Sequence, residues 1–350
     1  MNRSKPGARL ALVLAAALLP LPAHAFTRSP ATTFAVLPDG TAHPEGIAAD
    51  RAGTLYVTTF DVSRPAGPGQ LLVFAPSGRL LRQVSVAGSS QLLLGVAVRP
   101  FRPQGDPFDL LVVDFGAARV LAVNSATGDA ELFTEIPDDP ALPGTPGANA
   151  LAFDRAGHVY VSDSFQGAVW RTGPAGGPAV VWAASPLLRT EGVPPFGANG
   201  LAFNAAESAL FVANTGNDTV VRIPVSGGRA GTPEVFVNGV NGADGLFIDE
   251  ADNLWIAANQ ADEIVVLDPT GRVVAKLGDF DGISPQGEPV GLLFPASLVR
   301  SGPFVYVTNL ALDLEAALGL PTVDSQWAAQ VRRHTVARIR AHIPPLRGRP

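Results

Sequence analysis

The chain alternates short apolar runs with turns rich in Gly, Pro, Asp and Asn. One apolar run opens a unit that recurs six times, at intervals of 45–55 residues. The opening runs are residues 46–50, 95–100, 150–154, 200–204, 245–249 and 291–295. Further runs follow within each unit, and the fifth unit shows all four, at 245–249, 253–258, 262–271 and 272–277.

Four strands joined by tight turns describe one antiparallel sheet, and a sheet repeated at this period indicates a β-propeller. We therefore predict an all-β, six-bladed β-propeller of four-stranded antiparallel blades, covering residues 26–343. The last unit lacks an obvious fourth strand. Residues 32–38 resemble the fourth strands of other units, so this N-terminal strand is expected to complete the last blade by pairing with residues 335–343,.

Long connections are confined to one face of the predicted ring, whereas the turns on the other face are short. Loops on a rigid scaffold commonly carry function, so we expect the site on this face. The alternative is that long loops accumulated there without a role. The long segments are 61–68, 136–148, 184–198, 278–289 and 310–334.

The two chain ends carry features of their own. Residues 1–25 combine a basic start, the apolar run 10–19 and a small-residue site, so we predict a signal peptide cleaved after Ala25 and a periplasmic or secreted protein,. No other apolar run approaches the length needed to span a membrane. Residues 344–350 are expected to form a disordered basic tail.

Composition narrows the function. The absence of Cys among 350 residues excludes disulfides, thiolate metal sites and cysteine nucleophiles,. Residues 26–330 hold 16 Lys and Arg against 31 Asp and Glu, and such an acidic body repels nucleic acids,. We expect a monomer that acts on a small molecule.

The residue before each opening run should point toward the channel axis on the loop-rich face. Four of these six residues carry side-chain oxygens, and such a set suits Ca²⁺ best, with Mg²⁺, Mn²⁺ or Zn²⁺ as alternatives. Taken singly, Asn-Gly and Asp-Gly are also common turn dipeptides. Around the ring the six residues are Glu45, Leu94, Asn149, Asn199, Asp244 and Val290.

The motifs PEG (44–46), AN (148–149), ANG (198–200) and ADG (243–245) resemble those of the senescence marker protein/gluconolactonase (regucalcin-like) propellers. The resemblance implies that Glu45, Asn149, Asn199 and Asp244 hold one catalytic divalent cation, and that the substrate is a lactone, ester or phosphotriester. Sugar lactonases of this family often carry an Arg at the position of Gly147, so a less polar lactone or ester is also expected here.

Within a hydrolase, Asp244 would act as general base or as nucleophile, and His43 could assist proton transfer unless it is simply a solvated loop residue. Four polar residues that end second strands either support the metal ligands or cap the strands: Asp114, Asp163, Asn214 and Asn309. Three aromatic residues either line the pocket or belong to the core: Phe115, Phe165 and Phe196.

Two other functions compete with hydrolysis. A non-catalytic NHL-like propeller would bind a ligand or protein, with any metal purely structural. A lyase of the streptogramin-inactivating kind would need a histidine base near the axis, and His43 is its single candidate.

Overall fold

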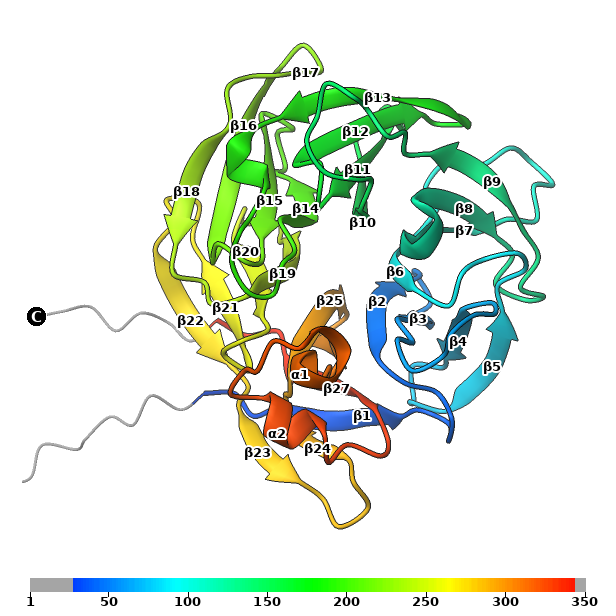
Figure 1. The fold of residues 1–350 in the computed structure, drawn as a ribbon, viewed down its shortest axis with the longest axis vertical. Coiled ribbons are helices and arrows are strands. Elements are labelled where there is room, and N and C mark those ends of the chain that lie inside the picture. Colours follow the sequence, from blue (N-terminus) through cyan, green and yellow to red (C-terminus); the bar gives the residue numbers. More distant parts are fainter. Residues whose placement is uncertain (1–27, 344–350) are drawn as a thin grey trace, which may run out of the picture.

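The computed structural model describes residues 28–343, which form a ring of six sheets around a central channel (Figure 1). The predicted signal peptide and basic tail lie outside the described residues. Blade 1 holds β2 (Pro44–Ala49), β3 (Leu55–Thr59), β4 (Gln70–Phe74) and β5 (Leu80–Ser85). Blade 2 holds β6 (Leu93–Val98), β7 (Leu110–Asp114), β8 (Arg119–Val123) and β9 (Ala130–Glu135). Blade 3 holds β10 (Ala148–Phe153), β11 (Val159–Asp163), β12 (Ala168–Gly173) and β13 (Gly176–Ala184).

The other three blades follow the same order from the axis outward. Blade 4 holds β14 (Ala198–Phe203), β15 (Ala209–Asn214), β16 (Thr219–Ser226) and β18 (Glu234–Asn238), with the short β17 (Arg229–Ala230) paired to β16. Blade 5 holds β19 (Ala243–Ile248), β20 (Leu254–Ala258), β21 (Glu263–Leu267) and β22 (Val273–Leu277). Blade 6 holds β25 (Pro295–Ser301), β26 (Phe304–Asn309), β27 (Thr335–Arg340) and β1 (Thr32–Val36). The predicted six-bladed all-β propeller is confirmed.

The ring is closed by its first strand. β1 pairs antiparallel with β27, with Thr32 opposite Arg338 and Val36 opposite Thr335. Leu37 follows this strand and is buried with Ile47, Leu55 and Val336, so one apolar cluster joins blades 6 and 1. The predicted completion of the last blade by the N-terminal strand is therefore confirmed.

One predicted strand is wrong. Residues 291–295 do not open blade 6, because Gly291 and Phe294 adopt positive φ angles of 83° and 46° that break an extended run. Instead, β23 (Phe280–Ile283) and β24 (Pro289–Gly291) form a separate hairpin, and β25 begins at Pro295. Ala296, and not Val290, therefore stands at the axial position of blade 6.

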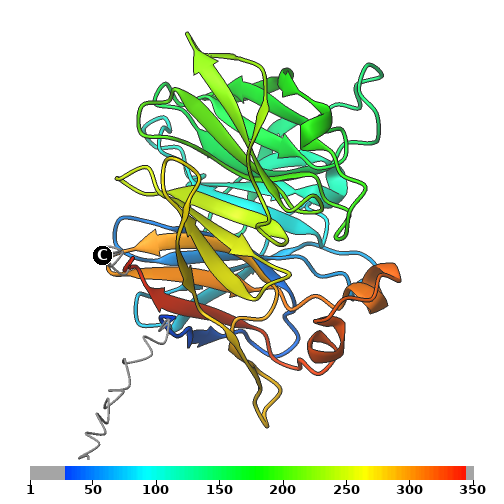
Figure 2. The ribbon, with the colours of Figure 1, turned by 90° about the vertical axis from the view of Figure 1, so that its left-hand side faces the viewer.

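The segment 310–334 carries the two α-helices of the described chain, α1 (Leu314–Leu318) and α2 (Ser325–Ala328). It projects from one face of the ring (Figure 2). Asp313 caps α1, since its carboxylate accepts hydrogen bonds from the backbone N–H groups of Glu315 and Ala316,. Within residues 28–343, no helix combines the length and apolar character required to cross a membrane.

Each first strand carries an irregularity near its start, and this feature positions the site. In every pair of first and second strands the register shifts by one residue, as between Pro44 and Ile47 or between Ala198 and Leu201. A bulge of this kind redirects a side chain. Glycine follows several of the redirected residues because the first strands crowd at the axis. A Cβ on Gly46 would lie 2.3 Å from the carbonyl oxygen of Leu94.

Candidate metal centre

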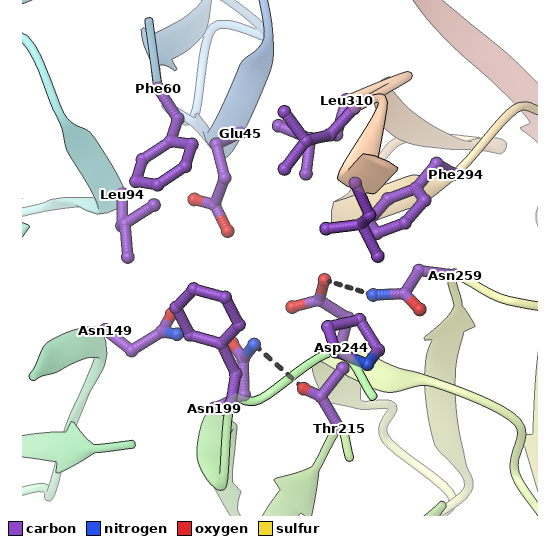
Figure 3. A pocket seen from close by; sticks show the side chains of 14 residues that line it. Glu45, Phe60, Leu94, Asn149, Asn199, Thr215, Asp244, Asn259, Phe294 and Leu310 are labelled. Carbon is purple, nitrogen blue, oxygen red and sulfur yellow. Dashed lines mark hydrogen bonds between the residues drawn. The ribbon is translucent and has the colours of Figure 1, made fainter. Parts of the chain in front are cut away.

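The bulges bring the four predicted ligands to one cavity on the channel axis. Glu45, Asn149, Asn199 and Asp244 come from blades 1, 3, 4 and 5 and all line this cavity (Figure 3). Each is almost fully buried, with 3–5% of its surface exposed. The corresponding residues of blades 2 and 6 are apolar. The structure thus places all four oxygen-bearing side chains together, as the strand register predicted.

The residues that orient these side chains form a second ring, which sequence reasoning missed. Asn149 Nδ2 donates to Ser164 Oγ at 3.0 Å, and Asn199 Nδ2 donates to Thr215 Oγ1 at the same distance. Because each amide nitrogen is held by a hydroxyl, the amide oxygen remains available to a cation. In blade 5 the bond is reversed, since Asn259 Nδ2 donates to Asp244 Oδ2 at 3.0 Å.

The three orienting residues share one sequence position. Ser164, Thr215 and Asn259 each directly follow the second strand of their blade. A polar residue after a strand is typical of any turn, so a single one does not indicate an orienting role. The pattern is visible in the sequence only when three successive blades are compared. In blades 1 and 6 the same position holds Phe60 and Leu310, which contribute apolar walls.

The polar residues that end the second strands, one position before these orienting residues, form hydrogen bonds with the surrounding loops. Asp163 Oδ1 accepts from the backbone N–H of Gly147 at 3.0 Å, and Asn214 Nδ2 donates to the carbonyl oxygen of Leu187 at 2.8 Å. Asn309 and Asp114 bond Gly291 and Ser90 in the same way. These contacts match the strand-capping alternative.

Two carboxylate oxygens in the cavity have no partner. Glu45 Oε2 and Asp244 Oδ1 are both buried without a hydrogen bond. Burial, and then the charge of Asp244, raises the pKa of Glu45 well above its usual value. Burial raises the pKa of Asp244 to about 7, although the amides of Asn259 and Asn199 oppose this shift. Two unpaired carboxylates in one buried cavity are costly unless a cation neutralises them.

The donor set fits a hard divalent cation. It offers two carboxylates and two amide oxygens, with a formal charge of −2, and this favours Ca²⁺ over metals that prefer nitrogen or sulfur. Among residues 28–343, no group of three or more His, Cys, Asp or Glu side chains is placed to hold a metal ion. The candidate centre differs from such groups because half of its ligands are amides.

His43 does not line the cavity. Its Nδ1 donates to the carbonyl oxygen of Leu310 at 3.0 Å, and its ring lies edge-on to that of His334 with 4.7 Å between centroids. Burial lowers the pKa of His43, although the Leu310 carbonyl and Asp61 oppose this shift. His43 is thus a packed residue, not a solvated one, and its role in proton transfer stays a prediction.

The apolar lining differs in part from the prediction. Of Phe115, Phe165 and Phe196, Phe196 lines the cavity, and the other two rings pack against it at centroid distances of 5.6–6.0 Å. Phe165 also covers Gly147, where a Cβ would lie 2.7 Å from its ring, so any side chain at this position would require Phe165 to move. Leu312 and Leu314 line the cavity as well and were not foreseen.

Comparison with known proteins gives a consistent picture of the fold. Residues 109–278 match the family described as SMP-30/Gluconolactonase/LRE-like region. A search of curated proteins found no match. A luciferin-regenerating enzyme shares 16% identity at a TM-score of 0.61, covering 87% of this chain and 92% of the other. A gluconolactonase from Xanthomonas campestris shares 17% sequence identity at a TM-score of 0.56, and the match covers 87% of this chain and 88% of the other.

A calcium-binding regucalcin from Agrobacterium tumefaciens shares 16% identity at a TM-score of 0.56, covering 90% of this chain and 98% of the other. Propellers with other activities, including a streptogramin B lyase, are also similar. At these identities the structural likeness establishes a common fold. The resemblance to the SMP-30/gluconolactonase family, predicted from four short motifs, is confirmed by the match over residues 109–278 and by the shared propeller.

Proposed function

We propose that this protein is a divalent-metal-dependent hydrolase of a lactone or ester, with Ca²⁺ as the preferred ion. The observation that carries the proposal is the pair of buried, unpartnered oxygens, Glu45 Oε2 and Asp244 Oδ1, which lie in one cavity beside two amide side chains. A purely structural channel would gain nothing from this arrangement, because apolar residues would fill the same space at lower cost.

The side chains of the cavity divide the work of the reaction. Glu45, Asn149, Asn199 and Asp244 would hold the cation, which when bound polarises the carbonyl oxygen of the substrate. Water adds to the carbonyl carbon, the C–O bond to the leaving alcohol breaks, and an acid and an alcohol are released. Asn259 holds Asp244 Oδ2 and so fixes the orientation of the carboxylate that would accept a proton from water or attack the carbonyl itself,.

The lyase alternative is weakened by the position of the histidines. No histidine is among the cavity-lining residues of the described chain, and the Nδ1 of His43 is committed to the Leu310 carbonyl. The non-catalytic alternative is decided by the experiment that follows.

The test is hydrolysis of a panel of lactones and aryl esters by the purified protein, with Ca²⁺ and with EDTA. We expect turnover with Ca²⁺, loss of at least about 100-fold under chelation, and a similar loss for Asp244→Asn. Asp249→Asn is the matched control. Asp249 lies directly after β19, at the end far from Asp244, and accepts hydrogen bonds from the side chains of Asn253 and Trp255. Undiminished turnover in EDTA would rule out the metal-dependent mechanism. Calcium binding without turnover of any substrate would favour a binding module.

A further inference from the structure

The cavity has a polar side and an apolar side (Figure 3). Asn149, Asn199 and Asp244 come from three successive blades and lie together. Across from them lie the apolar side chains of Phe60, Leu94, Phe294 and Leu310, with the carboxylate of Glu45 among them. With Glu45 committed to the cation of the proposed function, a molecule whose carbonyl reaches the polar residues has most of its remaining atoms against hydrocarbon.

The polar side has few groups to spare for a substrate. The amide nitrogens of Asn149 and Asn199 already bond Ser164 and Thr215, and that of Asn259 bonds Asp244. Within the described chain, no Arg, Lys, His or Tyr lines the cavity. Glu45 and Asp244 hold the cation in the proposed function, so most hydroxyl groups of a sugar lactone would lose water here without gaining partners, at a cost of about tenfold in binding for each group.

One segment supplies the rest of the apolar wall. Leu310, Leu312 and Leu314 occupy alternate positions from the end of β26 to the first residue of α1, and all three line the cavity with at most 6% of their surface exposed. The cavity volume of about 40 Å³ holds a few water molecules but no lactone ring,. A substrate therefore enters when a wall segment moves, and an apolar group on the substrate would replace the contacts that leucines lose.

We propose that the substrate is an uncharged lactone or ester carrying a hydrocarbon group, and that Leu312 is a specificity-determining residue that contacts this group. The inference rests on the proposed hydrolase function and deepens it. Each buried methylene is worth about fourfold in affinity, so a tail of a few carbons dominates the choice of substrate.

The first experiment compares kcat/KM for two δ-lactones of equal ring size, δ-decanolactone and glucono-δ-lactone, with Ca²⁺ present. We expect the alkyl lactone to be preferred by at least about tenfold. Leu312→Asn should lower this preference by about tenfold, whereas Leu312→Met should change it by less than about threefold. Leu318→Asn is the control, because Leu318 lies in α1 but is 49% exposed and outside the cavity. Equal turnover of both lactones, or an equal loss on both in Leu312→Asn, would overturn the inference and leave the hydrolase function intact.

A second measurement separates this inference from the hydrolase proposal. The ketone 2-pentylcyclopentanone has a ring carbonyl and an alkyl tail but no bond to hydrolyse, and its binding is followed by calorimetry. Tighter binding to the wild type than to Leu312→Asn, by about tenfold, supports the apolar site even if no lactone is hydrolysed. Absence of ketone binding together with absence of turnover would overturn the inference as well as the proposed function.

Discussion

Thr215 shows how a single hydroxyl can define a ligand set. Its Oγ1 accepts the amide hydrogen of Asn199 at 3.0 Å, and Thr215 is 1% exposed, so the hydrogen bond is shielded from bulk water. Without this acceptor the amide would be free to rotate and present nitrogen instead of oxygen to a cation. Residues that orient ligands in this way commonly contribute 10–100-fold to metal affinity.

The pair Thr215→Val and Thr215→Ser tests this role with almost unchanged volume. We expect Thr215→Val to weaken Ca²⁺ binding by about tenfold, because the amide of Asn199 loses its partner, and Thr215→Ser to stay within about threefold of the wild type. Isothermal titration calorimetry measures both affinities. Wild-type affinity in Thr215→Val would mean that Asn199 is held by other contacts or is not a ligand.

At the scale of elements, a turn of blade 5 lies against the helical segment. Asp262, between β20 and β21, accepts a hydrogen bond from the backbone N–H of Phe294 at 2.7 Å. Burial, together with the nearby charge of Asp324 at the start of α2, raises the pKa of Asp262 to about 8. Burial also raises the pKa of Asp324 to about 6. This junction is therefore most favourable when the carboxyl groups are protonated.

These shifts give stability a defined pH dependence. The folded chain binds a proton at Asp262 up to about pH 8, while the unfolded chain releases it near pH 4, so this contribution falls as pH rises through that window,. Asp262→Asn keeps an acceptor for the backbone N–H of Phe294 but has no proton to release. Between pH 5 and 8 the variant should therefore lose less unfolding free energy than the wild type, by on the order of 2 kcal/mol. Denaturant titrations at both pH values measure it.

Asp268→Asn is the control for that prediction. Hydrogen bonds from Thr270 and the neighbouring backbone lower the pKa of Asp268, so its titration falls below the window from pH 5 to 8. The control should therefore show the wild-type pH dependence. If Asp262→Asn also retains it, Asp262 is ionised in the folded protein and the burial argument fails.

The elements were largely predictable from the sequence, and the reason is local. Strand alternation, turn residues and a period near 50 residues were enough to predict the six blades and the closing strand β1. They were also enough to predict that four of the six axial positions carry side-chain oxygens. The error at Val290 arose because an apolar run looks the same whether it forms a strand or packs as irregular chain. In blade 6 the positive φ angles of Gly291 and Phe294 decided the outcome.

The missing parts of the site depend on distant contacts. Leu312 and Leu314 reach the cavity because the segment 310–334 folds back over the channel, which no local pattern specifies. Ser164, Thr215 and Asn259 are recognisable as orienting residues only once the neighbouring strand is in place. In contrast, the position of the four candidate ligands at one cavity could be predicted from the sequence because each directly precedes the apolar run of a first strand.

At the scale of the whole molecule, the candidate centre draws its side chains from both sides of the ring. Its four side chains come from blades 1, 3, 4 and 5. Blade 1 adjoins the closing seam, where Thr308 of blade 6 donates to the backbone carbonyl of Glu45 at 2.7 Å. A cation bound at the axis would hold both sides of the ring together, whereas without it two carboxylates repel each other across the channel.

This conflict predicts a reversal in the stability of Asp244→Asn. In EDTA at pH 8 the variant should be more stable than the wild type by about 1–3 kcal/mol, because it removes one buried charge beside Glu45,. With Ca²⁺ at 100 times its dissociation constant the wild type should gain about 2.7 kcal/mol, and the variant almost nothing. Denaturant titrations under the two conditions measure both differences. If the variant were the less stable protein in EDTA as well, Asp244 would be a structural residue of the channel and its free oxygen would need another explanation than a cation.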